Sequence, residues 1–253
     1  MDLGIENRVA LVTGSSRGIG RSIAATLASE GARVILVARS QDQLELVRAE
    51  LPGKEGQHHC FAIDLMSDNG VSNLVESIIG KIGYPDIAVN NLGGSYNIHE
   101  PFASSKQWQE VWQFNLGIGH ELNRAFIPQM VKNQWGRIVH ISTLATNTFR
   151  GSPAYVSAKC ALNGYVKSMS NHYSKDNVII SAVSPGAIYL EGRYFAKTMK
   201  ENPSELEEYY KNYLPIGRLG KAEEVGASVA FMCSELASFM PGSIVGIDGG
   251  GID

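Results

Sequence analysis

The stretch Arg8-Val9-Ala10-Leu11-Val12-Thr13-Gly14-Ser15-Ser16-Arg17-Gly18-Ile19-Gly20 joins a short β-rich run to a glycine turn. A helical pattern follows and stops at Gly31, and one side of it carries Ile23, Ala24, Leu27 and Ala28. A strand, a glycine turn and a helix in this order form the first half of a βαβ unit, in which backbone N–H groups receive a pyrophosphate. The spacing is GxxxGxG rather than GxGxxG, and an ordinary turn is the alternative. The flanking strand and helix favour nucleotide binding.

The next strand is expected at Val34-Ile35-Leu36-Val37 and is followed by Arg39. Many NAD sites have an acidic residue at about this point, where it binds the ribose 2′-hydroxyl. Here Arg39 and the Arg17 of the glycine turn offer two guanidinium groups, which can bind a 2′-phosphate. The pattern therefore favours NADP as the cofactor. Two solvated surface arginines are the alternative.

Apolar runs alternate with helical stretches along the whole chain. We expect five further strands, at about 58–63, 87–89, 137–141, 178–183 and 243–247. Between them we expect helices at about 41–50, from 67, 104–132, from about 155 through 169, and 222–236. This order is typical of the α/β class and predicts a doubly wound, Rossmann-like, mostly parallel sheet of about seven strands.

No linker, internal repeat or low-complexity tract interrupts the sequence. We therefore expect a single NADP-binding domain over residues 1–253. The segment at about 187–214 is expected to be irregular, because it is rich in Tyr, Lys and Glu. It is too long for a routine connection, which predicts a substrate lid over the site.

Composition excludes several functions. The chain has 22 Lys and Arg against 25 Asp and Glu, a net charge of −3, so it offers no basic field for nucleic acid. Cys60, Cys160 and Cys233 are widely spaced in apolar segments, which indicates reduced core residues and no metal site. The adjacent His58 and His59 would point to opposite faces of a strand, so they do not form a metal pair.

The N-terminus has no signal-peptide pattern, and no apolar run approaches the roughly 18 residues that a membrane span needs. We expect a soluble cytoplasmic protein without nucleic-acid or membrane partners.

Three residues in the second half of the chain suggest acid–base chemistry. Tyr155 and Lys159 are four residues apart and would share one face of a helix. Ser142 ends the apolar run 137–141, so it should open into the crevice at the carboxyl end of a strand. A nearby ammonium lowers the pKa of a tyrosine, so Lys159 would make Tyr155 a usable general acid or base. Ser142 would hold a carbonyl or alkoxide oxygen. An exposed Tyr–Lys pair without function is the alternative.

Polar or small residues also end other strands. Asp64 and Leu65 follow the third strand, where Asp64 would accept from an adenine amino group or cap the helix expected near Ser67. Asn90-Asn91-Leu92-Gly93-Gly94 follows the fourth strand and would admit the cofactor and bond its ribose, or form a plain turn. Asn115 lies inside a long helix, either as a kink that binds water or as a defect satisfied locally.

Taken together, these motifs resemble the short-chain dehydrogenase/reductase family over nearly the whole chain, including members that are 3-oxoacyl-ACP reductases. The family's TGxxxGIG corresponds to residues 13–20 and its NNAG to residues 90–93. Its catalytic set corresponds to Asn115, Ser142, Tyr155 and Lys159, and its PG motif to Pro185-Gly186.

The resemblance implies hydride transfer between a nicotinamide ring and a ketone or secondary alcohol, with Tyr155 as proton donor or acceptor. Lys159 would also bind the ribose, Asn115 would anchor a water, and many members are homotetramers. The implied cofactor-binding residues are Gly14, Ser16, Arg17, Gly18, Ile19, Gly20, Arg39, Asp64, Leu65, Asn91, Gly93, Tyr155, Lys159, Pro185, Gly186 and Ile188.

Two positions depart from the family pattern. Leu92 replaces the usual Ala, and Leu190 replaces a Thr that contacts the nicotinamide carboxamide. A silent NADP-binding regulatory protein and an NAD-dependent sugar or polyol dehydrogenase are the alternatives. A substrate pocket would include Ser95, Tyr96, Arg150, Tyr189, Arg193 and Tyr194, and its two arginines suggest an anionic substrate unless they are solvated surface charges.

Overall fold

The computed structural model describes residues 1–54 and 56–252. Its centre is a seven-stranded sheet in the order β3-β2-β1-β4-β5-β6-β7, and all neighbouring strands are parallel. The strands are β1 (Val9–Thr13), β2 (Arg33–Ala38), β3 (His59–Ala62), β4 (Ile87–Asn90), β5 (Gly136–Ile141), β6 (Val178–Pro185) and β7 (Ile244–Ile247). The predicted doubly wound parallel sheet is confirmed.

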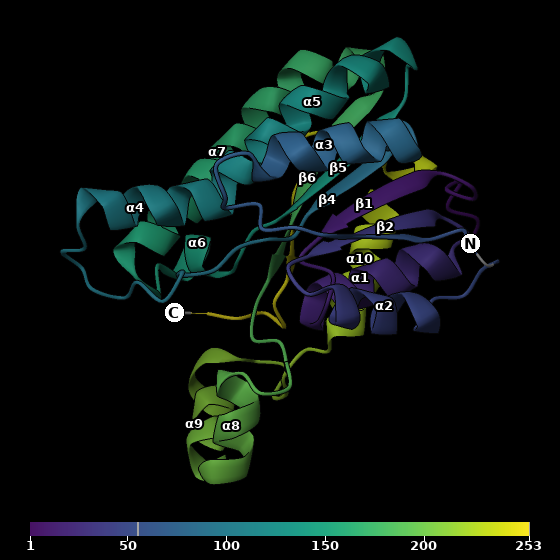
Figure 1. Ribbon diagram of the computed structural model, residues 1–253. Helices are drawn as coiled ribbons and strands as arrows, with labels where there is room; N and C mark the ends of the chain where they lie inside the picture. The colour runs from purple at the N-terminus through teal and green to yellow at the C-terminus, as the bar shows by residue number, and fades with distance from the viewer. Residues whose placement is uncertain (55, 253) are drawn as a thin grey trace.

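Helices cover both faces of this sheet, and Figure 1 shows α3, α5 and α7 on one side and α1, α2 and α10 on the other. The α-helices are α1 (Gly18–Ser29), α2 (Gln41–Glu50), α3 (Gly70–Lys81), α4 (Ser105–Trp112), α5 (Ile118–Lys132), α6 (Ala145–Thr148), α7 (Pro153–Tyr173), α8 (Tyr194–Glu201), α9 (Pro203–Tyr213) and α10 (Ala222–Met232). A π-helical turn, η1 (Gln113–Gly117), links α4 to α5, and the 3₁₀ turns are η2 (Ser174–Asp176) and η3 (Glu235–Ala237).

The core consists of one apolar cluster on each face of the sheet. Successive residues of β1 belong to different clusters: Leu11 packs with Phe126 of α5, and Val12 packs with Ile23 of α1. This alternation follows from the two-residue period of a strand. Because both faces are covered, the strands are nearly continuous apolar runs, and every residue of β6 is buried.

Two helical regions differ from the sequence prediction. The helix expected over 104–132 is interrupted by η1. The Asn115 side chain there donates to the Val111 carbonyl oxygen, which is the acceptor of the backbone N–H of residue 115 in a regular α-helix. The segment expected to be irregular, 187–214, contains α8 and α9. The sequence did not predict these helices because each of them buries a single apolar residue, Ala196 in α8 and Leu206 in α9. The partly buried rings of Phe195 and Tyr209, which lie 5.2 Å apart, pack against the cluster that contains Leu206.

Several boundaries also move. The third strand begins at His59 and ends at Ala62, α3 begins at Gly70 rather than near residue 67, and α10 ends at Met232. Strands β3 and β4 lie on opposite sides of the β2-β1 pair, so the chain crosses from one half of the sheet to the other between them. Ligands of open α/β sheets bind at the carboxyl ends of the strands beside such a switch point.

Candidate active site

A cleft of about 1880 Å³ lies at the carboxyl ends of the strands. It is lined by these predicted site residues: Gly14, Ser16, Arg17, Gly18, Ile19, Gly20, Arg39, Asp64, Leu65, Asn91, Gly93, Ser142, Tyr155, Lys159, Pro185 and Gly186. The structure therefore brings the glycine turn near the N-terminus and the Ser142, Tyr155 and Lys159 set into one continuous cleft. We call the part around the glycine turn and Arg39 the phosphate end, and the part around Tyr155 the catalytic end.

The glycine turn at the phosphate end is held by close backbone contacts. A Cβ on Gly20 would lie 2.3 Å from the Gly14 carbonyl oxygen, so no other residue fits at this point. The Asn91 side-chain amide donates to the backbone oxygens of Thr13 at 2.9 Å and Gly14 at 3.3 Å. Asn91 thus fastens the turn to the end of β4, and this tight, backbone-lined loop before α1 fits a pyrophosphate.

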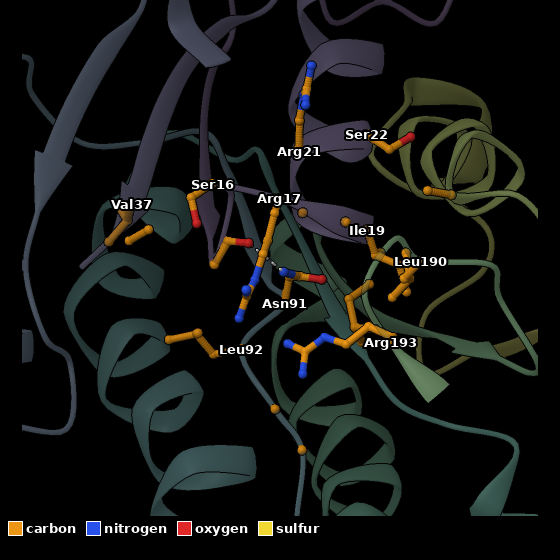
Figure 2. Close-up of a pocket in the computed structure, with 18 of the residues that line it drawn as sticks. Ser16, Arg17, Ile19, Arg21, Ser22, Val37, Asn91, Leu92, Leu190 and Arg193 are labelled. Atoms are coloured by element: carbon orange, nitrogen blue, oxygen red, sulfur yellow. Dashed lines mark hydrogen bonds between the residues drawn. The ribbon is translucent and has the colours of Figure 1, made fainter. Parts of the chain in front are cut away.

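Two arginines give the phosphate end its charge. Arg17 and Arg39 are both exposed, and among residues 1–54 and 56–252 neither forms an ion pair. Figure 2 shows Arg17 projecting into the cleft from the glycine turn and Arg193 from the opposite wall. Free guanidinium groups beside a loop of this kind fit the 2′-phosphate of a dinucleotide.

Asp64 lines the cleft but does not cap a helix. Its carboxylate accepts from the backbone N–H of Met66 at 2.9 Å, while α3 starts only at Gly70. The interpretation of Asp64 as the cap of the next helix is therefore wrong, because the chain first forms a turn. A contact between Asp64 and an adenine amino group stays a prediction.

The catalytic end is organised by α7, which starts with Pro153 in its first turn. Lys159 lies one turn after Tyr155 and is buried; its Nζ donates to the Ile141 carbonyl oxygen at 2.6 Å. Burial lowers the pKa of this lysine to about 7. A lysine whose pKa is close to neutral pH thus lies at the end of β5.

Burial also acts on Tyr155. It raises the pKa of the phenol above the ordinary value, and a hydrogen bond with the Thr143 side chain opposes that rise. The prediction that Lys159 lowers the pKa of Tyr155 is therefore wrong for the protein alone. The physical reason is that both groups are desolvated, which favours neutral phenol and neutral amine over phenolate and ammonium.

Asn115 lies behind the cleft wall, in η1. Its side chain exchanges two hydrogen bonds with the backbone of Gly94, accepting from the N–H at 3.0 Å and donating to the oxygen at 2.8 Å. It also donates to the Val111 oxygen at 2.8 Å. A Cβ on Gly93 would lie 2.7 Å from Lys159 Nζ and 2.8 Å from Asn115 Oδ1, so these two groups converge on the Gly93 backbone. These contacts agree with the interpretation that the Asn115 side chain is satisfied by hydrogen bonds to nearby backbone groups.

Ser142 has a partner that the sequence analysis missed. Its hydroxyl donates to Asn163 Oδ1 at 2.6 Å, and Ser142 is buried. Asn163 lies on α7, four residues after Lys159 and eight after Tyr155, so the rule that pairs the tyrosine with the lysine also selects Asn163. This spacing was the available signal.

Two departures from the family pattern have visible packing. A Cβ on Gly14 would meet Leu92 Cδ2 at 3.1 Å, so Leu92 fills the space over the glycine turn. Leu190 packs against the core and faces Gly18. Ile188 is not among the residues that line the cleft; its side chain packs on Gly220 and lines a neighbouring cavity of about 280 Å³. Any contact of Ile188 with a cofactor would use its backbone.

The expected substrate-pocket residues divide into two groups. Ser95, Tyr96, Tyr189 and Arg193 line the cleft. The Arg150 guanidinium instead stacks on the ring of Tyr213 at 3.8 Å, and the Tyr194 hydroxyl donates to Glu205 at 2.8 Å. Tyr194 thus links α8 to α9, and Arg150 links the loop before α7 to the end of α9; neither is among the residues that line the cleft.

Other reactive side chains do not form a second centre in the described part of the chain. Burial raises the pKa of Cys60 to about 11 and that of Cys233 to about 12, which leaves both thiols protonated. His58 accepts from the Val34 N–H at 3.0 Å, which ties β2 to the start of β3. Residues 1–54 and 56–252 contain no group of three or more His, Cys, Asp or Glu side chains that could hold a metal ion. No helix in these two ranges is both long and apolar enough to cross a membrane.

A parallel sheet with a glycine turn at its switch point, next to the half-buried Tyr155 and the buried Lys159, defines a Rossmann-type oxidoreductase. A family model described as enoyl-(acyl carrier protein) reductase matches residues 14–251. The 3-oxoacyl-(acyl-carrier-protein) reductase FabG of Aquifex aeolicus is 35% identical over 252 residues, which are 99% of either chain. The chain belongs to the short-chain dehydrogenase/reductase family, as its motifs predict, and is an enzyme.

Relatives with different substrates are similar to a comparable degree. The 7alpha-hydroxysteroid dehydrogenase of Escherichia coli is 30% identical over 253 residues, which are 99% of this chain and 96% of the relative. The L-sorbose reductase of Gluconobacter frateurii, solved with NADPH and L-sorbose, superposes with a TM-score of 0.90 at 33% identity and covers 99% and 98% of the two chains. Similarity alone therefore does not select a substrate.

Proposed function

We propose that this enzyme is an NADPH-dependent reductase that converts a ketone to a secondary alcohol, with Tyr155 as the general acid. The observation that carries the proposal is the cleft itself, which joins two exposed arginines at the phosphate end to Ser142, Tyr155 and Lys159 at the catalytic end. NADPH would supply the hydride. The bound cofactors of similar structures, such as the reductase solved with NADPH, support this choice.

The raised pKa of Tyr155 supports its role as a general acid. Because burial keeps the phenol protonated at neutral pH, Tyr155 can donate a proton to the oxygen of a ketone as that oxygen gains charge. Ser142 would donate a hydrogen bond to the same oxygen. Alcohol oxidation needs the phenolate instead, so it should increase as the pH rises toward the pKa of Tyr155.

Lys159 and Asn115 would act on the cofactor side of the tyrosine. The Lys159 amine is fixed by the Ile141 oxygen and would bond the ribose hydroxyls of the cofactor. Asn115 Oδ1 accepts from the Gly94 N–H, and its second lone pair would anchor a water beside Gly93, where Oδ1 and Lys159 Nζ converge. Both roles come from the family resemblance, and the buried, fixed positions of the two side chains support them.

Three further expectations belong to this proposal. The chain would work as a homotetramer in the cytoplasm, as expected from the family and from the sequence. Residues 1–253 would form a single NADP-binding domain. The region 187–214, with α8 and α9, would be the lid: Figure 1 shows these two helices standing away from the sheet. Tyr189 and Arg193, which precede α8, line the cleft.

The test is a substrate screen in which NADPH and NADH are compared with a 3-oxoacyl thioester, a keto sugar and a cyclic ketone, following the loss of absorbance of the cofactor. NADPH turnover on one of these carbonyls is expected. Faster turnover with NADH on the sugar would favour the NAD-dependent sugar dehydrogenase. Tight NADPH binding without turnover on any of the three would favour the silent regulatory protein.

A further inference from the structure

We propose that Asn163 is the positioning residue of Ser142 and that its carboxamide sets the direction of the Ser142 hydroxyl. When the amide presents its oxygen, the hydroxyl can accept a hydrogen bond from an alcohol; when the amide presents its nitrogen, the hydroxyl can donate one to a ketone. The proposal rests on the proposed ketone reduction. Its basis is the 2.6 Å hydrogen bond between Ser142 Oγ and Asn163 Oδ1 at the wall of the cleft.

The proton of the Ser142 hydroxyl makes this contact important. A hydroxyl has one proton, and in the observed arrangement that proton points to Asn163. Ser142 can then only accept a hydrogen bond in the cleft, which suits a bound alcohol. A ketone oxygen is purely an acceptor, so Ser142 has to donate to it.

An asparagine can meet both demands. The oxygen and nitrogen of its amide have nearly the same shape, and a half turn of the amide exchanges their places. With Nδ2 directed at Ser142, the amide donates to Oγ and the serine proton is free for the ketone. An aspartate in this position could only accept, and a leucine could do neither.

Asn163 is well placed for such a role. It belongs to the same face of α7 as Tyr155 and Lys159, and it is half-buried. The Lys159 amine already ties α7 to the end of β5 through Ile141, so the Asn163 contact is a second link between the same two elements. If the role of Asn163 is purely structural, its only function is to hold α7 against the end of β5.

The two roles predict opposite orders for two variants. Asn163→Asp keeps an acceptor for the Ser142 hydroxyl and would preserve a structural link, whereas Asn163→Leu would remove it. If Asn163 positions Ser142, Asn163→Asp is the worse variant, because it holds the serine proton away from the ketone. We expect kcat/KM for NADPH-dependent reduction to fall roughly 10–100-fold in Asn163→Asp and roughly tenfold or less in Asn163→Leu.

The measurement uses the fastest of the three carbonyl compounds named above, together with NADPH affinity by fluorescence and thermal unfolding. NADPH affinity should stay within about twofold of the parent, since a dinucleotide is not bound by Ser142. Lower pH should restore part of the Asn163→Asp activity, because a protonated aspartic acid can donate as the amide does. Asn171→Asp, which adds the same charge at an exposed position of α7, is the matched control and should retain parental activity.

A double-mutant cycle then asks whether Asn163 acts through Ser142. In a Ser142→Ala background, which itself should lower the rate by about 10²-fold, either change at Asn163 should have little further effect. Additive effects, or Asn163→Leu being slower than Asn163→Asp, would overturn the positioning role. If Asn163→Asp does not fold, the cycle with Asn163→Leu decides. A parent without turnover overturns the proposed function and this role together, whereas an active parent with additive effects overturns this role alone.

Discussion

The two ends of the cleft are built in different ways. At the catalytic end, Ser142 and Lys159 are 4% and 2% exposed, and each is held by a hydrogen bond of 2.6 Å. At the phosphate end the loop backbone is fixed by Asn91, but the charged groups, Arg17 and Arg39, are exposed and form no ion pair among the described residues.

Electrostatic effects therefore differ between the buried groups of the catalytic end and the exposed charges of the phosphate end. Buried groups shift their pKa values, because desolvation disfavours the charged form and salt screens little there. Exposed arginines keep their charge and attract a phosphate, but the attraction is weakened by salt. Changes at the catalytic end should therefore alter the rate and its pH profile, and changes at the phosphate end should alter cofactor affinity and its salt dependence.

Removing the Tyr155 hydroxyl is the strongest test of the catalytic end. Tyr155→Phe should lower kcat for NADPH-dependent reduction by roughly 10²–10⁴-fold, because the phenylalanine cannot donate the proton that the proposed reaction takes from Tyr155. Steady-state kinetics measures the loss, and fluorescence titration should find NADPH affinity unchanged. A variant that turns over as fast as the parent would contradict the assignment of the general acid.

Reversing a charge tests the phosphate end. Arg39→Asp should lower kcat/KM for NADPH tenfold or more, since a charge-assisted hydrogen bond contributes about 1.5–3 kcal/mol and the carboxylate adds repulsion. NADH should suffer much less. Both cofactors are compared in parent and variant at one salt concentration, with Arg124→Asp as the control, because Arg124 is exposed on α5 and is not among the residues that line the cleft. A parent that prefers NADH, or a cofactor ratio that does not move, would make Arg39 a plain surface charge.

The two arginines of the expected substrate pocket should differ from each other. Arg193 lines the cleft, so Arg193→Ala should raise KM for a carboxylate-bearing substrate by roughly threefold to fivefold, as expected of an exposed charge. Arg150 stacks on Tyr213, so Arg150→Ala should lower the unfolding temperature and leave KM nearly unchanged. Kinetics and thermal unfolding of both variants provide the comparison. An unchanged KM in both would remove the hypothesis of an anionic substrate.

The smallest expected effect concerns the stability of the cofactor-free protein. Burial lowers the pKa of Lys159 to about 7, whereas an unfolded lysine has a pKa of about 10.4. Between these values the unfolded chain binds a proton that the folded chain does not, so this group makes stability rise with pH from about 7 to about 10. Lys159→Met removes that slope.

The unfolding temperature of Lys159→Met minus that of the parent should therefore be highest at or below pH 7 and fall by about 5 °C or more toward pH 10. Loss of the bond to the Ile141 oxygen shifts the difference equally at every pH and leaves its slope unchanged. Thermal scans at pH 6, 8 and 10 measure it, and Lys167→Met on the exposed side of α7 is the control. A difference independent of pH would mean that Lys159 stays charged in the folded protein.

Much of this fold could be predicted because its signals are local. The apolar run of β1, the glycine turn and the start of α1 are contiguous, and their spacing alone indicates a βαβ unit. The helices α8 and α9 were not predicted, because each of them buries a single apolar residue, Ala196 in α8 and Leu206 in α9. One buried apolar position per helix is too few to define a helical period in a segment rich in Tyr, Lys and Glu.

By itself the sequence determined the seven strands, most of the helices between them, the family, and most of the residues that meet in the cleft. It did so because strand and helix periods and motif spacings are properties of neighbouring residues. Only the tertiary structure decided how these residues behave: that Asn163 holds Ser142, that Asn115 lies behind Gly93, and that the pKa of Tyr155 is raised rather than lowered. Burial and contacts between distant segments control hydrogen-bond partners and pKa values, and these arise only when the chain is packed.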